Sequence, residues 1–404
     1  MPHHNKYKAS FSFLVLILLS GFILTSHGQN KKNTNFEGVK FDSAINFKRV
    51  EFDSAAVFSK AMFYSQVNFS TAIFYSNAYF SGTEFHSPVD FSNAFFKSDV
   101  DFTGTKFKSL ATFKGTTFHS YTKFSYAQFN SNVSFFDATF DTNVDFFLTK
   151  FHSQVDFFAA QFNSSVGFDL ATLPDYLCFE YVRKIKNEID LTYAHLDEHK
   201  RTNNKNYRCK INLLNSDISK IKINYEIFKL WFPNYSTYEE KISTYEKLLK
   251  KFKDDSFLES YKKLDIEYQD YKNTYNGKIV LNWFLKYWWN YGYDKELVLV
   301  WSLCLFLVFS FLNSFLFEYL QRNVFEVNFK FYTKIDSKHS LLKTLKNSAL
   351  YSINPLIYTA VIFFGIKISL EHFKKFSGWV LYIWLIYIVG LFCLAYIFNI
   401  IIVK

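Results

Sequence analysis

Phenylalanine recurs along the first half of the chain with a regular spacing. From Phe36 to Phe168 a set of 25 Phe stands alternately five and six residues apart, so two of them fall in every eleven residues. Two positions before each of these Phe stands Ala, Val or Thr, with Ile45 as the sole exception. Side chains two positions apart point to the same side of an extended chain. The pattern therefore predicts short strands that each send one small and one large side chain inward.

A hydroxyl residue marks every second interval of this pattern. Two positions after the first Phe of each unit stands Ser, replaced once by Thr142. A side chain that hydrogen-bonds the backbone is typical of a corner, and equivalent hydroxyls without a paired base are not nucleophiles. An eleven-residue period could also repeat on a helix, but the β-branched and aromatic residues between corners favour strand and turn.

The Ala/Val/Thr-x-Phe spacing resembles the pentapeptide-repeat proteins, in the Phe-centred variant that expands every second five-residue face by one residue. Units such as FDSAAVFSKAM, FKSDVDFTGTK and FHSQVDFFAAQ carry the resemblance. It implies a mainly β protein, with a right-handed quadrilateral β-solenoid over residues 29–172 and two units in each coil. Some family members block DNA gyrase with an acidic, DNA-like rod. Residues 29–170 carry 12 Lys and Arg against 13 Asp and Glu, so we expect no nucleic-acid partner.

The apolar period changes after Thr172. Residues 173–235 keep strand-like spacing with Ile and Leu in place of Phe, and we interpret them as irregular closing coils, since a solenoid end needs a cap. Residues 236–276 follow helical spacing in two sets. They predict an amphipathic helix hairpin whose first helix has Ser236 or Thr237 as its N-cap.

The last third of the chain predicts membrane helices. Residues 297–317 and 379–403 contain no charged residue before the terminal lysine, and both are long enough to span a bilayer. Residues 347–368 are apolar but interrupted by Asn354-Pro355, which indicates either a broken span or a re-entrant segment. Trp and Tyr are concentrated in residues 277–296, as in segments that lie at the headgroup level.

Both ends of the chain bear on its location. Lys6 and Lys8 precede a short uncharged run that ends in small residues, which is typical of a signal peptide over residues 1–28. The alternative, an uncleaved anchor, is disfavoured because the run falls short of the ~20 residues that span a bilayer. Residues 318–346 hold six basic and three acidic residues, which predicts a cytoplasmic connection. We therefore expect an inner (cytoplasmic) membrane protein, in contact with membrane lipid, whose repeats are extracytoplasmic.

Composition and candidate chemistry narrow the function classes. With 52 Phe but only 12 Gly and 5 Pro, the chain is neither collagen-like nor a flexible low-complexity polymer. Four Cys are too few for a disulfide framework, and only Cys178 and Cys209 could pair. His195 to His199 match the zinc pattern HxxEH, but in a strand-and-loop context that disfavours a metal site.

The other histidines and the remaining motifs of the chain indicate no catalytic site. His86, His119 and His152 recur after every third eleven-residue unit. This interval is one and a half coils, so successive histidines fall on opposite faces. No glycine-rich phosphate loop is present, and neither predicted span contains an ionisable residue of the kind that proton relays use. We therefore expect no enzyme, with no catalytic, metal or cofactor-binding residue.

Three Phe outside the alternating set are candidate surface contacts. Phe136, Phe147 and Phe158 each directly follow an inward Phe, so they are expected to point outward. Phe136 and Phe158 would stack on one face, one coil apart, and Phe147 would lie on the opposite face. Exposed aromatic patches often mark contact surfaces. We predict that one face docks the helix hairpin or the closing coils, while the other meets a partner or stays free.

The C-terminal half carries a second resemblance. YEKLLKKFKDDSFLESYKKLDIEYQDYKN, KYWWNYGYDKELV and GLFCLAYIFNIII are similar to membrane-anchored pentapeptide-repeat proteins common in Bacteroidota. This implies a non-enzymatic, membrane-anchored scaffold or binding protein, with a protein partner or self-association. The alternative is an oligomeric ion-conducting or mechanosensing protein related to two-helix channels, although TAVIFFGIKI lacks their Thr-x-Gly-Tyr-Gly filter run.

Overall fold

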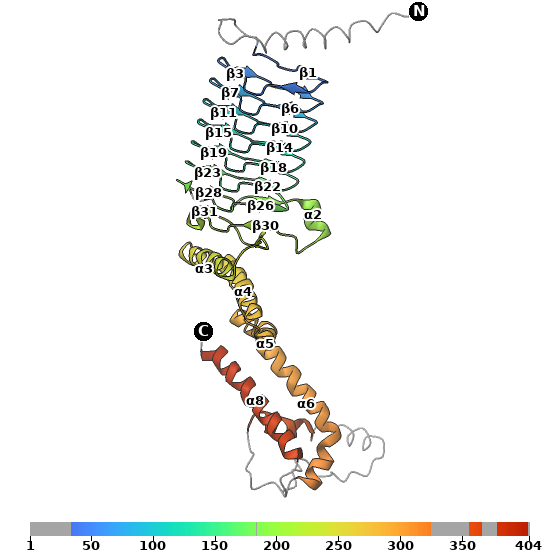
Figure 1. Ribbon diagram of the computed structural model, residues 1–404. Helices are drawn as coiled ribbons and strands as arrows, with labels where there is room; N and C mark the ends of the chain where they lie inside the picture. Colours follow the sequence, from blue (N-terminus) through green and yellow to red (C-terminus); the bar gives the residue numbers. More distant parts are fainter. Residues whose placement is uncertain (1–33, 183, 325–354, 366–377, 403–404) are drawn as a thin grey trace, which may run out of the picture. The chain divides into compact units, whose positions relative to one another are not determined.

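The computed structural model describes residues 34–182, 184–324, 355–365 and 378–402 (Figure 1). The chain divides into a unit that ends at Tyr268 and a second unit from Gln269 onward. The predicted signal peptide, residues 1–28, and most of the predicted cytoplasmic connection lie outside the described residues.

The first unit is a solenoid whose short strands form four parallel sheets. Through most of the solenoid each strand pairs with its equivalent two eleven-residue units later, as in Val89 with Ala111. This register confirms the predicted coil of two units. Two-residue strands are the rule because a corner separates each strand from the next.

The first sheet contains β1 (Lys40–Phe41), β5 (Met62–Phe63), β9 (Glu84–Phe85), β13 (Lys106–Phe107), β17 (Gln128–Phe129), β21 (Lys150–Phe151), β25 (Thr172–Leu173) and β29 (His195–Leu196). The second contains β2 (Ile45–Asn46), β6 (Val67–Asn68), β10 (Val89–Asp90), β14 (Ala111–Thr112), β18 (Val133–Ser134), β22 (Val155–Asp156), β26 (Tyr176–Cys178), β30 (Cys209–Asn212) and β32 (Phe228–Leu230). The third contains β3 (Glu51–Phe52), β7 (Ile73–Phe74), β11 (Phe95–Phe96), β15 (Thr117–Phe118), β19 (Thr139–Phe140), β23 (Gln161–Phe162) and β27 (Lys184–Ile185). The fourth contains β4 (Ala56–Val57), β8 (Ala78–Tyr79), β12 (Val100–Asp101), β16 (Thr122–Lys123), β20 (Val144–Asp145), β24 (Val166–Gly167), β28 (Ile189–Asp190) and β31 (Ile221–Lys222).

The inward Phe side chains form four columns of stacked rings. Rings one coil apart have centroids between 4.5 and 5.3 Å apart, with planes within 14° of parallel. Phe102, for example, stacks on Phe80 at 4.9 Å and on Phe124 at 4.8 Å. Ala, Val and Thr two positions before each Phe are buried in nearly every coil. The predicted pair of inward side chains is therefore confirmed.

Buried threonine hydroxyls in this core find backbone acceptors. Thr83 Oγ1 donates to the Phe58 carbonyl at 2.7 Å, and Thr105 Oγ1 donates to the Phe80 carbonyl at the same distance. Because a buried hydroxyl without a partner is costly, this bond explains why Thr can take the place of Ala or Val.

Two kinds of corner alternate along the solenoid. At the serine corners, Ser65 Oγ donates to the Asp42 carbonyl and Ser87 Oγ to the Tyr64 carbonyl, both at 2.7 Å. These bonds reach back to the preceding coil. At the other corners a residue with positive φ recurs every eleven positions, from Gly38 to Tyr181. Only some of these residues are Gly. At most of these corners a residue with a side chain therefore adopts the left-handed backbone conformation, which costs Gly the least.

The regular register ends after Thr172. β23 pairs with β27 one position out of step with the earlier coils, so that Phe162 lies beside Ile185. β26 pairs with β30 across a longer stretch of chain, because the short helix α2 (Glu198–Asn203) is inserted between them. Leu173, Leu177 and Ile189 are buried in positions that Phe or Val holds earlier. The coils thus continue beyond the Phe repeat, with aliphatic filling.

A helix hairpin follows the last coil. The 3₁₀ turn η1 (Ile218–Lys220) precedes α3 (Tyr238–Asp254) and α4 (Leu258–Tyr275). Thr237 is the N-cap of α3 and forms a reciprocal capping box with Glu240, so Thr237 holds the predicted N-cap position, and Ser236 does not. α3 lies against the last coils, where Asn215 Nδ2 donates to Glu240 Oε1 at 3.3 Å and Lys251 Nζ to the Ser219 carbonyl at 2.9 Å.

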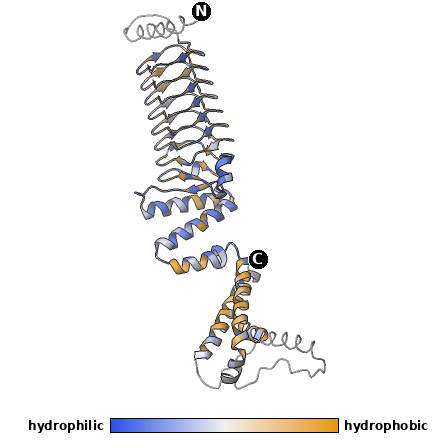
Figure 2. Ribbon diagram, turned by 90° about the vertical axis from the view of Figure 1, so that its right-hand side faces the viewer, coloured by the Kyte–Doolittle hydropathy of each residue, from blue (hydrophilic) through white to orange (hydrophobic). Residues whose placement is uncertain are grey.

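The second unit is helical and contains α5 (Ile279–Trp289), the 3₁₀ turn η2 (Asn290–Gly292), α6 (Glu296–Asn323), a short helix over residues 355–363 and α8 (Gly378–Ile402). α6 and α8 are each long and apolar enough to cross a membrane, and hydrophobic residues dominate both in Figure 2. The structure thus confirms the predicted fold class, a β-solenoid followed by helices, two of which are candidate membrane spans.

The ring columns generate a stability prediction. We expect Phe124→Ala to lower the free energy of unfolding by about 3–5 kcal/mol, because it opens a cavity between two stacked rings. The neighbouring change Lys123→Ala removes an outward, exposed side chain and should cost less than about 1 kcal/mol. Unfolding of the detergent-solubilised protein, followed by the β signal in circular dichroism, measures both. Equal losses would contradict the assignment of inward and outward positions.

Candidate functional site

The outward Phe form short aromatic contacts on the surface of the first unit. The rings of Phe136 and Phe158 stack at 5.1 Å with planes 1° apart, and Phe158 also contacts the Tyr181 ring at 5.3 Å. Phe136 is 40% exposed. Phe147 contacts a different residue, Tyr126, at 5.7 Å. The expected docking of this surface stays a prediction.

The zinc-like pattern does not lie on one helix. His195 belongs to β29, whereas α2 begins only at Glu198. His195 Nε2 lies 3.1 Å from Thr172 Oγ1, and the Asp197 side chain caps α2 by accepting from the His199 N–H at 2.9 Å. These residues close a coil and start a helix. Within the described ranges, no three His, Cys, Asp or Glu side chains are grouped so that they could hold a metal ion.

The recurring histidines each lie beside a carboxylate. His86 Nε2 is 3.2 Å from Glu84 Oε2, His119 pairs with Asp141, and His152 Nδ1 is 3.7 Å from Asp197 Oδ2. Each pair joins side chains on the outer surface of the coils.

Cys178 and Cys209 are both buried and form no disulfide. In the sheet Cys178 pairs with Asn212, so Cys209 lies three positions, or about 10 Å, further along the neighbouring strand. Burial raises the pKa of the Cys178 thiol to about 12 and raises that of Cys209 further. Both thiols are therefore neutral and poorly reactive at neutral pH.

A partly buried carboxylate joins the last coil to the hairpin. Glu267 on α4 accepts hydrogen bonds from Tyr225 Oη at 3.1 Å and from Tyr245 Oη at 3.0 Å. The backbone N–H of Tyr225 donates to Ser260 Oγ at 3.1 Å. Burial raises the pKa of Glu267 above its ordinary value, against the lowering effect of these hydrogen bonds and of Lys229 and Arg208.

Three polar side chains connect the helices of the second unit. Asn313 of α6 donates from Nδ2 to Thr359 Oγ1 at 2.8 Å, and Tyr382 Oη of α8 donates to Asn313 Oδ1 at 2.9 Å. Thr359 Oγ1 in turn donates to the Pro355 carbonyl at 2.7 Å. Asn313 and Thr359 are fully buried. Such bonds fix which helix faces meet in an otherwise apolar assembly.

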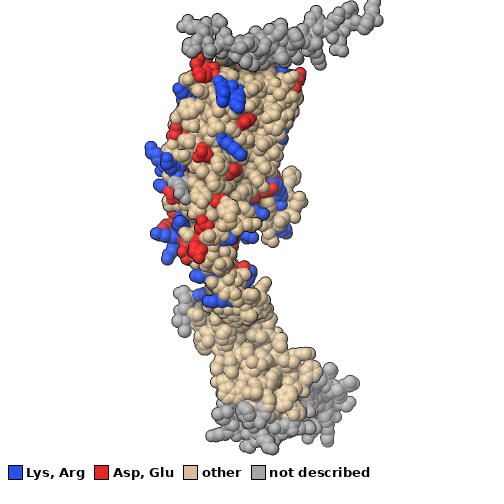
Figure 3. All heavy atoms as spheres, viewed as in Figure 1, with Lys and Arg blue, Asp and Glu red and all other residues tan. Residues whose placement is uncertain are grey.

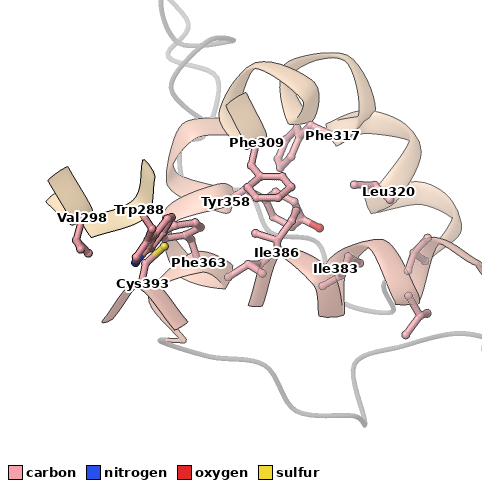
Figure 4. Packing of buried hydrophobic residues seen from close by; sticks show 13 residues of the cluster. Trp288, Val298, Phe309, Phe317, Leu320, Tyr358, Phe363, Ile383, Ile386 and Cys393 are labelled. Atoms are coloured by element: carbon pink, nitrogen blue, oxygen red, sulfur yellow. The ribbon is translucent and has the colours of Figure 1, made fainter. Parts of the chain in front are cut away.

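The short helix over residues 355–363 lies between α6 and α8. Tyr358 contacts Phe317, and Phe363 contacts Phe306 and Phe309, so this helix runs antiparallel to α6 (Figure 4). Its length is about 14 Å, less than half of the ~30 Å of a bilayer core. By itself this helix is too short to cross. The rest of the predicted segment, 347–354 and 366–368, lies outside the described residues.

A glycine on α8 permits this packing. A Cβ on Gly390 would lie 1.8 Å from the Phe363 carbonyl oxygen, a distance that no side chain tolerates. Gly390 is near the middle of α8, so the short helix ends beside the midpoint of that helix. The last turn of the short helix leads to Gly365, whose φ of +70° favours glycine.

The first unit contains residues that match a known protein family. Residues 69–117 and 80–128 match the family described as pentapeptide repeats (9 copies). These residues lie in the regular part of the solenoid, where four parallel sheets enclose the Phe columns. The solenoid is a pentapeptide-repeat domain. No curated protein and no solved structure matches the chain.

The pentapeptide-repeat domain presents a mixed surface. In Figure 3 basic and acidic side chains are interspersed over it. Glu84 accepts from Lys106 and Lys108, both at 2.9 Å, and these hydrogen bonds lower the pKa of Glu84 to about 2.

The sequence alone did not predict the Glu267 network, the Asn313–Thr359–Tyr382 bonds or the role of Gly390. A small residue within a predicted apolar span is the one sequence feature that could have indicated close helix packing at Gly390.

The Glu267 network generates a pH prediction. Because the folded-state pKa is raised, its contribution to stability is complete below about pH 4.5 and is lost as pH rises through the folded-state pKa. We expect Glu267→Gln to remove this loss, since an amide resembles the protonated acid. Melting temperatures of both proteins between pH 4 and pH 8 test this. Glu259→Gln, at an exposed position of α4, should keep the wild-type profile; a wild-type profile in Glu267→Gln would contradict the prediction.

The contact at Gly390 generates a packing prediction. We expect Gly390→Ala to displace the short helix and to cost at least about 1–3 kcal/mol, as overpacking does. Gly378→Ala is the matched control, because a Cβ there has no atom within 4 Å. Melting of the helical signal in detergent measures both. If both variants melted at the wild-type temperature, the close approach would be wrong.

Proposed function

We propose that this protein is a membrane-anchored, non-enzymatic scaffold whose repeat domain is extracytoplasmic and binds a protein partner, or a second copy of itself, through its outer surface. The observation that carries the proposal is the filled interior of the solenoid. Stacked rings occupy its centre, and the buried Thr hydroxyls bond to carbonyls. A ligand has no space there, so recognition falls to the outer faces and the ends.

Anchoring is supported by the second unit. α6 and α8 are apolar along their length, and most of each candidate span is open to its surroundings. A helix that exposes apolar side chains all round is suited to lipid and not to water. The Trp and Tyr on α5, next in sequence before α6, are suited to the headgroup level.

Orientation is the part of the proposal that an experiment decides directly. We expect a cysteine in Lys114→Cys, at an exposed position of the repeats, to react with a membrane-impermeant maleimide in intact spheroplasts. A cysteine in Lys338→Cys, within the basic connection, should react only after permeabilisation. Cys178 and Cys209 will give little background because they are buried with raised pKa values. The reverse labelling pattern would place the repeats in the cytoplasm and refute the proposal.

A second candidate function is ion conduction by an oligomer. The short helix over residues 355–363, which ends beside the midpoint of α8, favours it, because half-length helices line ion pathways in channels. Purified protein in lipid vesicles loaded with a potassium-sensitive dye tests this candidate. We expect no flux above that of empty vesicles if the protein is a scaffold. Flux that is lost in Gly390→Ala but kept in Gly378→Ala would establish conduction.

A further inference from the structure

The N-terminal end of the solenoid is open among the described residues. In the first coil Thr34, Phe36, Val39, Ile45 and Val50 are only partly buried. Their equivalents one coil later are at most 1% exposed, and they are Ala56, Phe58, Ala61, Val67 and Ala72. These five side chains of the first coil therefore lack the covering layer that their equivalents receive, although Phe41, Phe47 and Phe52 of the same coil are at most 4% exposed.

Backbone groups at this end also lack a partner strand. In the second coil the N–H groups of Met62 and Tyr64 donate to the carbonyls of Val39 and Phe41, both at 2.9 Å. The equivalent N–H groups in the first coil belong to Lys40 and Asp42, and no described coil precedes them. β1, β2 and β3 are each the last strand of their sheet, and in the fourth sheet Asn35 of the first coil pairs with Val57 of β4 and takes the edge position. Exposed strand edges are templates for pairing with another chain.

The opposite end of the solenoid differs. There the last coil is covered by α3 and α4, through Tyr225, Ser260 and Glu267. One end is thus closed by the chain itself, and the other is not closed by any described residue.

The chain that precedes the first coil is too short to close it after export. Removal of the predicted signal peptide leaves residues 29–33, which extend over at most about 18 Å. A covering coil takes two eleven-residue units, as the pairing of Lys40 with Met62 shows. This step rests on the export that the proposed function includes.

We propose that the open end pairs with the same end of a second copy of this chain, head to head. A two-fold axis perpendicular to the solenoid axis makes the two ends self-complementary. It reverses the strand direction, so the edge strands of the two first coils meet antiparallel and extend each other's sheets. The partly exposed Phe36, Val39, Ile45 and Val50 then cover their counterparts in the other copy.

The charges of the outward residues favour one orientation of the two-fold axis. β1 and β3 lie on opposite faces of the coil and carry Lys40 and Glu51 as outward residues. A two-fold axis that exchanges the β1 and β3 faces brings Lys40 of one copy to Glu51 of the other. A two-fold axis that passes through both faces would instead place Lys40 opposite Lys40 and Glu51 opposite Glu51. The selected axis also brings Asp42 near Arg49 of the other copy.

One contact across the selected axis is unfavourable. The selected axis brings Glu37 near Asp53 of the other copy, and these two carboxylates repel each other. Lys60 Nζ, 3.7 Å from Glu37 Oε1, offsets part of that repulsion.

The molar mass of the full-length protein in detergent, by light scattering with the detergent contribution subtracted, tests the proposal. We expect two chains per particle in the wild type. Lys40→Glu and Glu51→Lys should each halve the mass, and the double variant Lys40→Glu/Glu51→Lys should restore it. Lys150→Glu, on the same face five coils further on, should remain dimeric. Circular dichroism of each variant verifies that the solenoid is folded.

Three results would overturn the proposal: a wild-type particle with one chain, a dimer that Lys40→Glu leaves intact, or a purified chain that retains residues 1–28 by intact mass. The second result would place the interface elsewhere, for example on α6 and α8. Maleimide labelling of Lys114→Cys separates this test from that of the function. A monomer labelled in intact spheroplasts removes the dimer but leaves the extracytoplasmic scaffold standing.

Discussion

Stacking of Phe rings at the spacing of parallel strands is the interaction on which the first unit depends. Neighbouring strands in a sheet lie about 4.8 Å apart, and offset-stacked rings are favourable at nearly the same separation. The centroid distances of 4.5–5.3 Å satisfy both requirements at once. A residue that occupies the same inward position in each coil can therefore be Phe every time without straining the sheet. Within the Phe repeat the constant separation of 22 residues between paired positions, as in Val89 with Ala111, keeps the rings in register.

Because rings fill the centre, the surface and the ends of the solenoid are the parts that the proposed recognition of a partner can use. With rings filling the centre, the residues free to vary are the outward ones, and these include Lys–Glu pairs, His–carboxylate pairs and the Phe136–Phe158 stack. The ends need separate solutions because a ring column has no natural stop. At the C-terminal end the chain supplies α3 and α4 and a tyrosine–glutamate network. At the N-terminal end the described residues leave strand edges and apolar side chains uncovered, and the proposed pairing between copies rests on this.

Specificity in the second unit arises from a few polar and small residues. Apolar side chains surround α6 and α8, and apolar contact alone does not select one packing arrangement in lipid. Asn313, Thr359 and Tyr382 select it by hydrogen bonds, and Gly390 selects it by allowing the backbone at Phe363 to approach. The same contacts end the short helix beside the midpoint of α8. This geometry is compatible with a tightly packed anchor and with a half-length helix of the kind that channels use.

The sequence by itself determined the coil length, the inward and outward positions of the Phe repeat, the serine corners, the helix hairpin and the two long apolar helices. Each of these follows from a short period along the chain, and local periodicity needs no knowledge of distant contacts. The apolar spacing predicted closing coils after Thr172, but only the tertiary structure decided their register, because the α2 insertion lengthens the connection between β26 and β30. It also decided that Cys178 faces Asn212 and not Cys209, that Glu267 meets Tyr225, and that Gly390 meets Phe363. These pairs are far apart along the chain or are set by strand register, so no local pattern reports them.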